Sequence, residues 1–516
     1  MLIVGGGING AVSAAALAAR GVQVGLIDKG DFAGFTSQQS SNLVWGGIKY
    51  MEGYEFGLVN GLCKSRNELL RSFPSMVKEI RFLMAIHREF RFHPWVILAS
   101  TWLYWLFGRG QTRKPRRLTA AQLKHAEPLV DTAISHGGVE YSDAFLHDND
   151  ARFVFNFVRD AMDHGCMAAN YVALEHAERD AQGQWQAELK DQMNGEGFRL
   201  ETKILINAAG AYVDPINQAC GVDTEHRHLL SKGIHLIVPQ LSDQHRVLAF
   251  FANDERLFFA IPMAHRTCLG TTDTRVENPV TEVTDADRDF VLDNINARLD
   301  LPQPLTHDDI IAERCGVRPL AVCKQQNTDA DFQQLSRRHV IESHSNQQHI
   351  SIFGGKLTDC LNVGEEMCER VAQLGIQLGP RKKWYGEPEP VERETYLDRA
   401  KSLGIDQIIA SDTGEVLSQR LWRRYGSKAF AMLDAIEANP RMCEPIIEHA
   451  GIRRCEIDHL AQNEMIVCLE DYLRRRSKIE LLVPRATLRE STGLFEACEK
   501  LFGDDAKQKF DEYFDH

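Results

Sequence analysis

The chain has 516 residues, of which 44% are hydrophobic and 25% carry a charge. That length is enough for two or three domains with a large core, and the composition is ordinary for a globular protein. The net charge of −13 argues against a nucleic-acid partner, because the molecule as a whole repels phosphate backbones.

The twelve cysteines are scattered along the chain. They form no C-x-x-C pair and no Cys/His spacing that is typical of zinc, so we predict no metal site. The N-terminal segment does not have the pattern of a secretory signal. We therefore expect reduced thiols in a cytoplasmic protein.

The start of the chain predicts a strand, a glycine turn, a helix and a second strand. The apolar residues Leu2–Val4 precede a G-x-G-x-x-G pattern made by Gly5, Gly7 and Gly10, and an alanine-rich helix follows. These glycines allow a tight turn, close approach of a pyrophosphate and close helix packing, and the helix N-terminus faces the phosphates. The second strand ends at Asp28, where an acid can bind a ribose hydroxyl pair. The segment predicts a dinucleotide site.

The segment that precedes this glycine turn is short. Only four residues precede Gly5, although the first strand of such a fold is central and normally among the longer ones. We expect either a shortened strand or a start of the protein upstream of Met1.

Two later segments repeat the pattern of a strand that ends in small residues. The strand Ile204–Ile206 leads to Ala209 and Gly210, and the strand in "HISIFGGKLTD" ends at Gly354 and Gly355. After Asp28, moreover, the strand–helix alternation of a nicotinamide enzyme does not continue. Glycines that end separate strands let the backbone approach one extended cofactor, which favours FAD.

Ordered segments along nearly the whole chain resemble the FAD-dependent, quinone-linked glycerol-3-phosphate dehydrogenases of the glutathione-reductase/D-amino-acid-oxidase superfamily. They are "GGGINGA", "TSQQSSNLVWGGIKYMEGYEF", "EYSDAFL", "INAAGAYVD", "KGIHLIVP", "LGTTDT", "GVRPL", "SIFGGKLTD", "YGS" and "NEMIVCLEDYLRRRSK". The resemblance implies FAD, with no reason to expect a covalent link. It also implies oxidation of sn-glycerol 3-phosphate to dihydroxyacetone phosphate, a quinone acceptor and a peripheral place on the cytoplasmic face of the membrane.

The same resemblance assigns site residues. For the substrate it implies Lys49, Tyr50, Arg318 and Lys356, and cations of this kind suit a phosphate ester. For the chemistry, His235 is the best candidate base by residue type, with Arg318 and Lys356 beside it; Lys232 or Arg318 is expected to hold the developing alkoxide. The expected cofactor residues are Gly5, Gly7, Asn9, Gly10, Asp28, Thr36, Ser37, Ser41, Gly46, Gly47, Ala209, Gly210, Gly354, Gly355, Lys356, Leu357 and Thr358.

Three departures from the family surround this implied pocket. The family usually reads His-Gly-Gly-Leu-Arg-Tyr where this chain has Trp45 for the histidine and Lys49 for the arginine, and it often has Tyr-Arg after "GGKLT", where this chain reads Asp-Cys-Leu361. Lysine keeps the charge but loses bidentate geometry. Two alternatives therefore stay open: a flavin oxidase that acts on an amino or hydroxy acid with oxygen, or a non-catalytic flavoprotein.

The segment "FHPWVILASTWLYWLF", residues 92–107, is too short for a membrane span. We expect a buried helix of the substrate domain. The alternative is a surface helix that dips into a membrane, supported by a basic run just after it, although a solvated loop is the commoner fate of such a run. The run consists of Arg109, Arg113, Lys114, Arg116 and Arg117.

The expected fold class is α/β, with a Rossmann-type FAD-binding domain, an inserted antiparallel-sheet substrate domain and a C-terminal all-helical cap. The FAD-dependent region covers 1–376, with the FAD domain at about 1–70, 145–230 and 340–376 and the substrate domain at about 71–144 and 231–339. Residues 377–390 form a linker rich in proline and charge, and 391–516 show helical periodicity. Within that last part, "RRYGSKAF" and "YLRRRSK" are expected to be solvated basic faces. The oligomeric state is left open.

Overall fold

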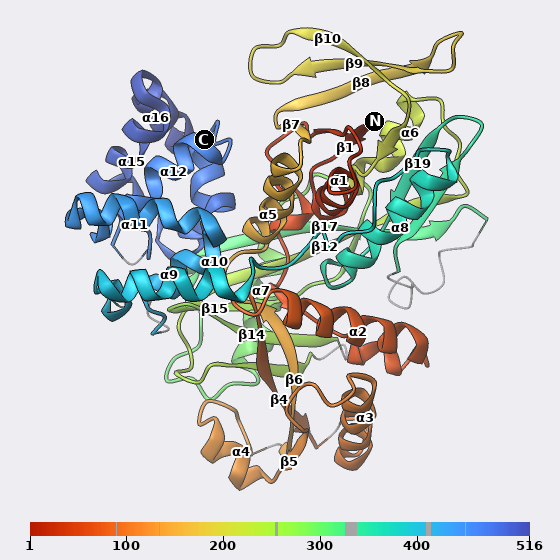
Figure 1. Cartoon of the computed structure of the whole chain (residues 1–516). Coiled ribbons are helices and arrows are strands. Elements are labelled where there is room, and N and C mark those ends of the chain that lie inside the picture. Colours follow the sequence, from red (N-terminus) through yellow and green to blue (C-terminus); the bar gives the residue numbers. More distant parts are fainter. Residues whose placement is uncertain are drawn as a thin grey trace.

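The computed structural model describes residues 1–88, 90–133, 135–252, 256–325, 338–408, 414–448 and 450–515. Within these residues the chain forms a six-stranded sheet, a sheet of ten strands, a separate three-stranded sheet and a helical C-terminal region (Figure 1). The expected α/β fold class, with an antiparallel sheet and helices at the C-terminal end, is confirmed.

The six-stranded sheet is parallel apart from one edge strand. Its order is β18 (Val340–His344), β19 (His349–Phe353), β11 (Leu205–Asn207), β1 (Leu2–Val4), β2 (Gly25–Ile27) and β7 (Met167–Ala169). The three apolar residues of β1 are buried in its centre, as parallel strands covered on both faces require. The helix α1 (Ile8–Ala18) packs against α5 (Asp150–Asp163) and α8 (Cys360–Gln373), and its alanines permit this close approach.

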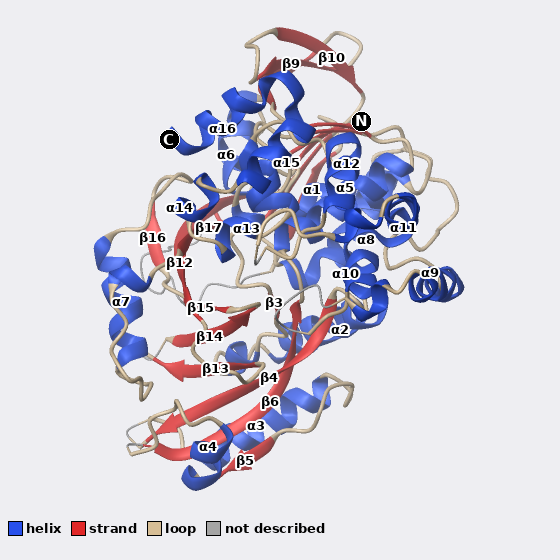
Figure 2. Cartoon of the chain, turned by 90° about the vertical axis from the view of Figure 1, so that its left-hand side faces the viewer, coloured by secondary structure: helices blue, strands red, loops and turns tan. Residues whose placement is uncertain are grey.

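The ten-stranded sheet is mainly antiparallel, and its strands follow one another down the molecule (Figure 2). The expected strands in residues 256–274 are confirmed as β14 and β15. Helices α2 (Phe56–Ser72), α3 (Pro94–Phe107), α4 (Ala120–Ala126) and α7 (Asp285–Asn296) flank it. The strands are β3 (Leu43–Val44), β4 (Val77–His87), β5 (Arg116–Leu118), β6 (Ser135–Leu146), β12 (His226–Pro239), β13 (Arg246–Phe251), β14 (Leu257–Met263), β15 (Arg266–Gly270), β16 (Thr274–Val276) and β17 (Ala312–Cys323).

The domain limits drawn from the sequence remain a prediction. In the structure β6 continues two residues past 144 and β12 begins five residues before 231, so both long strands cross those limits. A small sheet that the sequence did not single out lies at the top of Figure 1, above α6 (Val213–Ala219). It consists of β8 (Val172–Arg179), β9 (Trp185–Asp191) and β10 (Gly197–Thr202).

The C-terminal region is helical, as its periodicity predicts. Its buried apolar side chains form one core with part of the larger sheet. The helices are α9 (Pro390–Ser402), α10 (Leu417–Tyr425), α11 (Ala429–Ala438), α12 (Arg454–Asn463), a π-helical turn at Asp471–Arg476, α13 (Ile479–Leu482), α14 (Arg485–Arg489), α15 (Thr492–Phe502) and α16 (Ala506–Asp515).

The two arginine-rich segments of this region are not solvated faces, so that expectation was wrong. Their arginines are buried, Arg423 and Arg424 in one segment and Arg474–Arg476 in the other. Each segment meets carboxylates from far away in the sequence: Arg424 pairs with Asp148 at 2.8 Å. A buried guanidinium is tolerated when it is paired in this way, and no local pattern announces such a partner.

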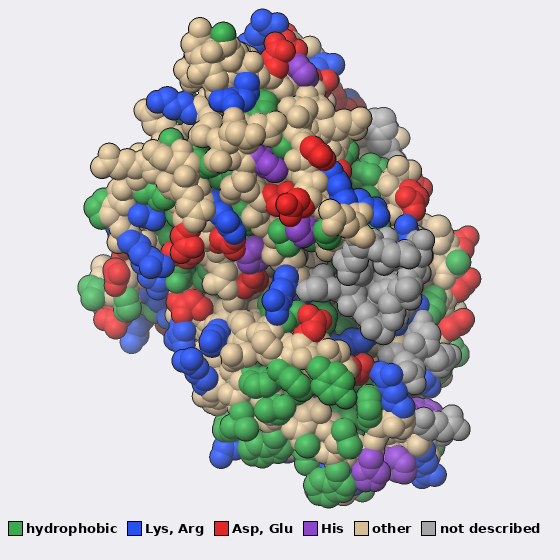
Figure 3. Space-filling model, turned by 90° about the vertical axis from the view of Figure 1, so that its right-hand side faces the viewer, with side chains coloured by type: hydrophobic (Ala, Val, Ile, Leu, Met, Phe, Trp, Pro, Cys, Tyr) green, Lys and Arg blue, Asp and Glu red, His purple; other side chains and the backbone are tan. Residues whose placement is uncertain are grey.

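The expectation of a buried helix at residues 92–107 was also wrong. Helix α3 lies on the surface, with 57% of Trp95 and 60% of Leu106 exposed. Hydrophobic side chains gather on this lower part of the molecule (Figure 3). Among the helices that the structure describes, none combines the length and the apolar character needed to cross a bilayer.

Candidate active site

Three glycine-containing segments meet at one edge of the six-stranded sheet. They follow β1, β11 and β19, which are parallel neighbours, so their carboxyl ends lie together. Gly5 has a φ of +103°, and a Cβ there would lie 2.6 Å from the Ala208 carbonyl oxygen. Asn9 Nδ2 donates to the Gly354 carbonyl oxygen at 3.0 Å. The structure thus brings together three segments that lie far apart in the sequence.

The first turn of α1 has features that fit a dinucleotide. Gly7 caps the helix without a side-chain hydrogen bond, and a Cβ on it would meet just one described atom within 4 Å, Ser37 Oγ at 3.2 Å. Ile8 N donates to the same Oγ at 3.0 Å. Asn9 Oδ1 is buried without a hydrogen-bond partner in the described part of the chain. Open space, a helix N-terminus and an unsatisfied polar atom are what a pyrophosphate-bearing ligand requires.

Asp28 serves the same turn in the structure. Its Oδ2 accepts a hydrogen bond from Gly6 N at 2.7 Å and its Oδ1 accepts one from Gly30 N at 2.9 Å. Burial raises the pKa of this carboxyl to about 7. The carboxylate therefore holds the glycine turn in shape, and its contact with a ribose stays a prediction.

The segment 36–46, which begins with the hydroxyl-rich residues 36–41, links this edge to the larger sheet. Thr36 Oγ1 donates to the Val317 carbonyl oxygen at 2.7 Å, next to Arg318 on β17. Gly46 N donates to Asp143 Oδ1 at 3.2 Å, and Thr358 Oγ1 donates to the Trp45 carbonyl oxygen at 3.3 Å. The segment thus runs between the expected cofactor residues and the expected substrate residues.

A buried network under Gly46 was missed by the sequence analysis. Asp143 pairs with Arg66 at 3.0 Å and accepts a hydrogen bond from Tyr104 Oη at 2.5 Å. Burial raises the pKa of Asp143 despite the charge of Arg66. Asp143 lies in the quoted segment "EYSDAFL", but its partners come from α2 and α3, and nothing in the segment names them.

The structure brings Lys356, Tyr50 and Trp45 together. Lys356 Nζ donates a hydrogen bond to Tyr50 Oη, and it lies 3.9 Å from the centre of the Tyr50 ring and 5.9 Å from the centre of the Trp45 ring. An ammonium over aromatic faces is stabilised by the ring quadrupoles. The position where the family usually has histidine thus supplies an aromatic wall beside the lysine. Lys49 lies half-buried in the preceding 3-10 turn, Ile48–Met51.

Arg318 and His235 lie on one face of the neighbouring strands β17 and β12. Arg318 Nη2 donates to Thr271 Oγ1 at 2.9 Å, and Nη1 donates to the Thr272 carbonyl oxygen at 3.2 Å. His235 is paired in register with Gly270, the residue before Thr271. Burial lowers the pKa of His235 well below its ordinary value, and the charges of Arg314 and Arg318 add to that effect.

These two groups of residues are neighbours across the sheet. Phe259 is the register partner of Gly270, and its ring lies 6.3 Å from the ring of Trp45. Lys232, in contrast, is held by Asp287 of α7 at 2.5 Å. Because side chains alternate along a strand, Lys232 points away from the face that carries His235. That position argues against the alkoxide role considered for Lys232.

The departures after "GGKLT" have separate explanations. Cys360 and Leu361 are buried in the core at the start of α8. Asp359 Oδ2 pairs with His339 Nδ1 at 2.9 Å, and Glu366 pairs with the other ring nitrogen at 3.0 Å. Burial would lower the pKa of His339, but the two carboxylates outweigh it and raise the pKa to about 9. The sequence analysis missed this histidine.

A glycine-lined edge beside a sheet that carries cations fits a flavoprotein oxidoreductase, and residues 1–357 match the model of the family described as FAD dependent oxidoreductase. The chain belongs to this family, and its cofactor is FAD. Residues 392–509 match the family described as the C-terminal domain of alpha-glycerophosphate oxidase.

Relatives with established names cover nearly the whole chain. The glycerol-3-phosphate dehydrogenase of Pseudomonas tolaasii is 30% identical over 93% of this chain and 91% of its own length. The Synechocystis glycerol-3-phosphate dehydrogenase is 28% identical over 93% of this chain and 89% of its own length. The glycerol-3-phosphate dehydrogenase from Bacillus halodurans, solved with FAD, has a TM-score of 0.73 at 24% identity and covers 100% of this chain and 93% of its own. This last likeness supports the fold.

Proposed function

We propose that the protein oxidises sn-glycerol 3-phosphate to dihydroxyacetone phosphate and passes the electrons to a quinone. The observation that carries the proposal is the pair of cationic groups, Arg318 and Lys356, on adjoining segments beside the glycine-lined edge. The names of the full-length relatives support the same substrate. FAD, when bound, supplies the acceptor for a hydride from the substrate carbon.

The protein's residues take the following roles in this proposal. Arg318 binds the substrate phosphate through its planar fork, and Thr271 keeps that fork oriented. Lys356 and Tyr50 bind substrate oxygens and oppose negative charge that develops there, with Lys49 as a further cation. His235, neutral because burial lowers its pKa, accepts the hydroxyl proton.

The expected cofactor residues also belong to the proposal. The turn from Gly5 to Gly10, with Asn9, faces the pyrophosphate, and Asp28 shapes that turn. Thr36, Ser37 and Ser41 line the path toward the substrate sheet. The backbones of Gly46, Gly47, Ala209, Gly210 and Gly354–Thr358 let the cofactor approach closely.

A substrate comparison tests the proposal. Purified protein with FAD bound is assayed with glycerol 3-phosphate and an artificial electron acceptor, and with a panel of amino and hydroxy acids. We expect turnover with glycerol 3-phosphate. Turnover with a carboxylate substrate and oxygen alone would establish the alternative oxidase, for which Trp45 and Lys49 leave room, and bound FAD with no turnover would establish a non-catalytic flavoprotein.

The quinone acceptor requires access to a membrane, and α3 offers a contact. Trp95, Val96, Trp102, Leu103 and Leu106 are exposed on it. Two cations of the basic run lie over tryptophan rings of this helix: Arg117 lies 4.7 Å from the centre of a Trp95 ring, and Lys114 lies 6.0 Å from the centre of a Trp105 ring. Apolar side chains flanked by cations suit an anionic bilayer surface. We therefore assign the peripheral membrane contact to α3 and residues 109–117.

Vesicle sedimentation tests this contact. The wild-type protein should bind vesicles that contain anionic lipid, and Leu106→Ser should weaken binding several-fold. Val280→Ser is the matched control, because Val280 is 73% exposed and lies outside α3. Equal binding of the two variants would reject α3 as the contact, and loss of quinone reduction with retention of the artificial acceptor would link the contact to the acceptor.

A further inference from the structure

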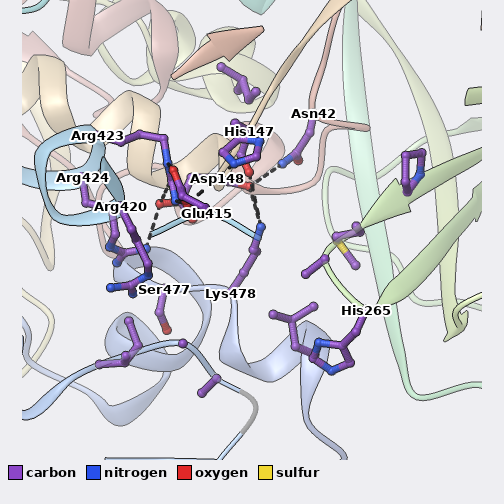
Figure 4. A pocket seen from close by; sticks show the side chains of 18 of the residues that line it. Asn42, His147, Asp148, His265, Glu415, Arg420, Arg423, Arg424, Ser477 and Lys478 are labelled. Atoms are coloured by element: carbon purple, nitrogen blue, oxygen red, sulfur yellow. Dashed lines mark hydrogen bonds and ion pairs between the residues drawn. The ribbon is translucent and has the colours of Figure 1, made fainter. Parts of the chain in front are cut away.

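A cavity of about 300 Å³ lies between the larger sheet and the C-terminal helical region (Figure 4). Its walls come from the segments 261–265 and 145–148, from Arg314 on β17, and from α10 and the turn after Arg476. None of the residues proposed for catalysis lines it. Ser41, one of the expected cofactor residues, does line it, so the cavity adjoins the proposed site without containing its catalytic residues.

Two of the three lining carboxylates, Asp148 and Glu415, pair with arginines of α10, and the third, Glu448, is exposed. Asp148 pairs with Arg423 at 2.7 Å and with Arg424 at 2.8 Å, and Glu415 pairs with Arg423 at 2.8 Å. Figure 4 shows these side chains turned toward one another on one wall. The nearby His147 adds no charge at neutral pH, because burial lowers its pKa to about 4.

Two cations of the lining have no carboxylate within 4 Å in the described part of the chain. Arg314 is 1% exposed, and its Nη1 donates to the Ser40 carbonyl oxygen and to Asn42 Oδ1 at 3.0 Å. Its Nε and Nη2 are buried without a hydrogen-bond partner among the described residues.

Lys478 is the second cation. The carbonyl oxygens of His147 and Asp148 accept from its Nζ at the long distances of 3.5 and 3.4 Å. Burial lowers the pKa of its ammonium to about 8, which still leaves most of it charged at neutral pH. Buried charges are normally paired, so two such groups on one cavity indicate a missing anionic partner.

We propose that the cavity binds a compact dianion, a phosphate monoester or a dicarboxylate, between Arg314 and Lys478. A bidentate contact with Nε and Nη2 of Arg314 suits either group. The ligand would tie the C-terminal region, through Lys478, to β17. Arg314 is also the register partner of His235, so both side chains lie on the same face of the strand pair and the proposed site adjoins the proposed base.

The proposal is tested on the FAD-loaded protein with inorganic phosphate and with succinate as separate probes, at constant ionic strength. Binding is measured by calorimetry and by the shift of the unfolding temperature. Because phosphate also fits the proposed substrate site, Arg318→Ala is the background: it removes that contact and should leave one saturable dianion site. In that background Lys478→Gln and Arg314→Gln should each weaken binding by at least tenfold. Lys507→Gln, an exposed lysine of α16, is the control.

The outcomes separate the two proposals. Succinate binding without phosphate binding assigns the dicarboxylate, and the reverse assigns the phosphate monoester. If neither probe binds the Arg318→Ala protein, or if Lys478→Gln and Arg314→Gln bind as tightly as the control, the dianion site is overturned. If the protein did not oxidise glycerol 3-phosphate, the proposed function would fail, but the binding result for the dianion site would still hold, because no glycerol 3-phosphate enters this test.

Discussion

Arg476 and Asp31 lie 445 positions apart in the sequence and form a two-point ion pair, with Nη1 and Nη2 donating to Oδ2 and Oδ1 at 2.6 and 2.9 Å. Arg475 Nε donates to the same carboxylate at 2.8 Å. Asp31 follows β2 of the six-stranded sheet. The pair therefore joins the C-terminal helical region to the segment that follows Asp28.

Removing the charge of Asp31 should destabilise the protein strongly. In Asp31→Asn, two buried guanidinium groups lose their shared partner, and a broken buried pair costs about 3–5 kcal/mol of unfolding free energy. Urea unfolding of the FAD-loaded protein measures the change. The control is Asp515→Asn, which breaks an exposed pair with Arg489 and should leave the midpoint almost unchanged. Equal midpoints for the two variants would contradict a structural role for Asp31.

Much of the glycine-lined edge could be predicted from the sequence, because its signals are local. The turn that they form sets the spacing of Gly5, Gly7 and Gly10, and this turn has a strand before it and a helix after it. The glycines after β11 and β19 could be assigned to the same edge because parallel strands end on one side. The strands in residues 256–274 and the C-terminal helices follow from residue pattern in the same way, whereas the small sheet of β8, β9 and β10 was not predicted.

The partners of buried charges could not be predicted. Arg476 and Arg424 look like any basic surface residues until the chain is folded, since Asp31 and Asp148 are hundreds of residues away. The prediction that α3 is buried failed for a different reason. An apolar helix is normally buried, and no local signal says that its outer face lacks a covering element. The His339 cluster was missed because its two carboxylates, Asp359 and Glu366, belong to a later segment of the chain and reach the ring only after folding.

The glycine turn gives a prediction about cofactor binding. The wild-type protein should purify yellow and release its flavin on denaturation. Gly7→Leu should abolish flavin binding, because the new side chain would occupy the open space in front of α1. Gly61→Leu is the control, since a Cβ on Gly61 meets no described atom within 4 Å and its backbone lies in α2. The measurement is the flavin absorbance normalised to the protein concentration. A yellow Gly7→Leu protein would contradict the assignment of flavin binding to this edge.

The raised pKa of His339 predicts a dependence of stability on pH. Its folded-state pKa of about 9 lies above the ordinary value of 6.5, so the stabilisation is complete below about pH 6.5 and is lost as the pH rises through about 9. We expect the unfolding temperature to fall over that window in the wild type and to fall less in His339→Gln. His136→Gln, at an exposed position, should keep the wild-type profile. Parallel profiles for wild type and His339→Gln would contradict the raised pKa assigned to His339.

The substrate pocket gives the last prediction. Arg318 should matter most for glycerol 3-phosphate, because its fork is oriented by Thr271 and can form two charge-assisted hydrogen bonds to a phosphate. Loss of such a contact to a desolvated phosphate costs about 2–5 kcal/mol. Arg318→Ala should then lower kcat/KM by roughly 30-fold or more, at about 1.4 kcal/mol per factor of ten.

Lys49→Arg separates the two interpretations of this chain's departure from its relatives. If lysine only weakens phosphate recognition, the guanidinium should preserve or raise kcat/KM with glycerol 3-phosphate, because it restores bidentate geometry. If lysine serves a carboxylate substrate, the same change should lower activity with that substrate and gain nothing with the phosphate. Lys428→Arg, at an exposed position, controls for the substitution itself. Lys356 already lies against Tyr50 and Trp45, so a gain in Lys49→Arg would mean that the substrate phosphate also reaches the 3-10 turn that carries residue 49.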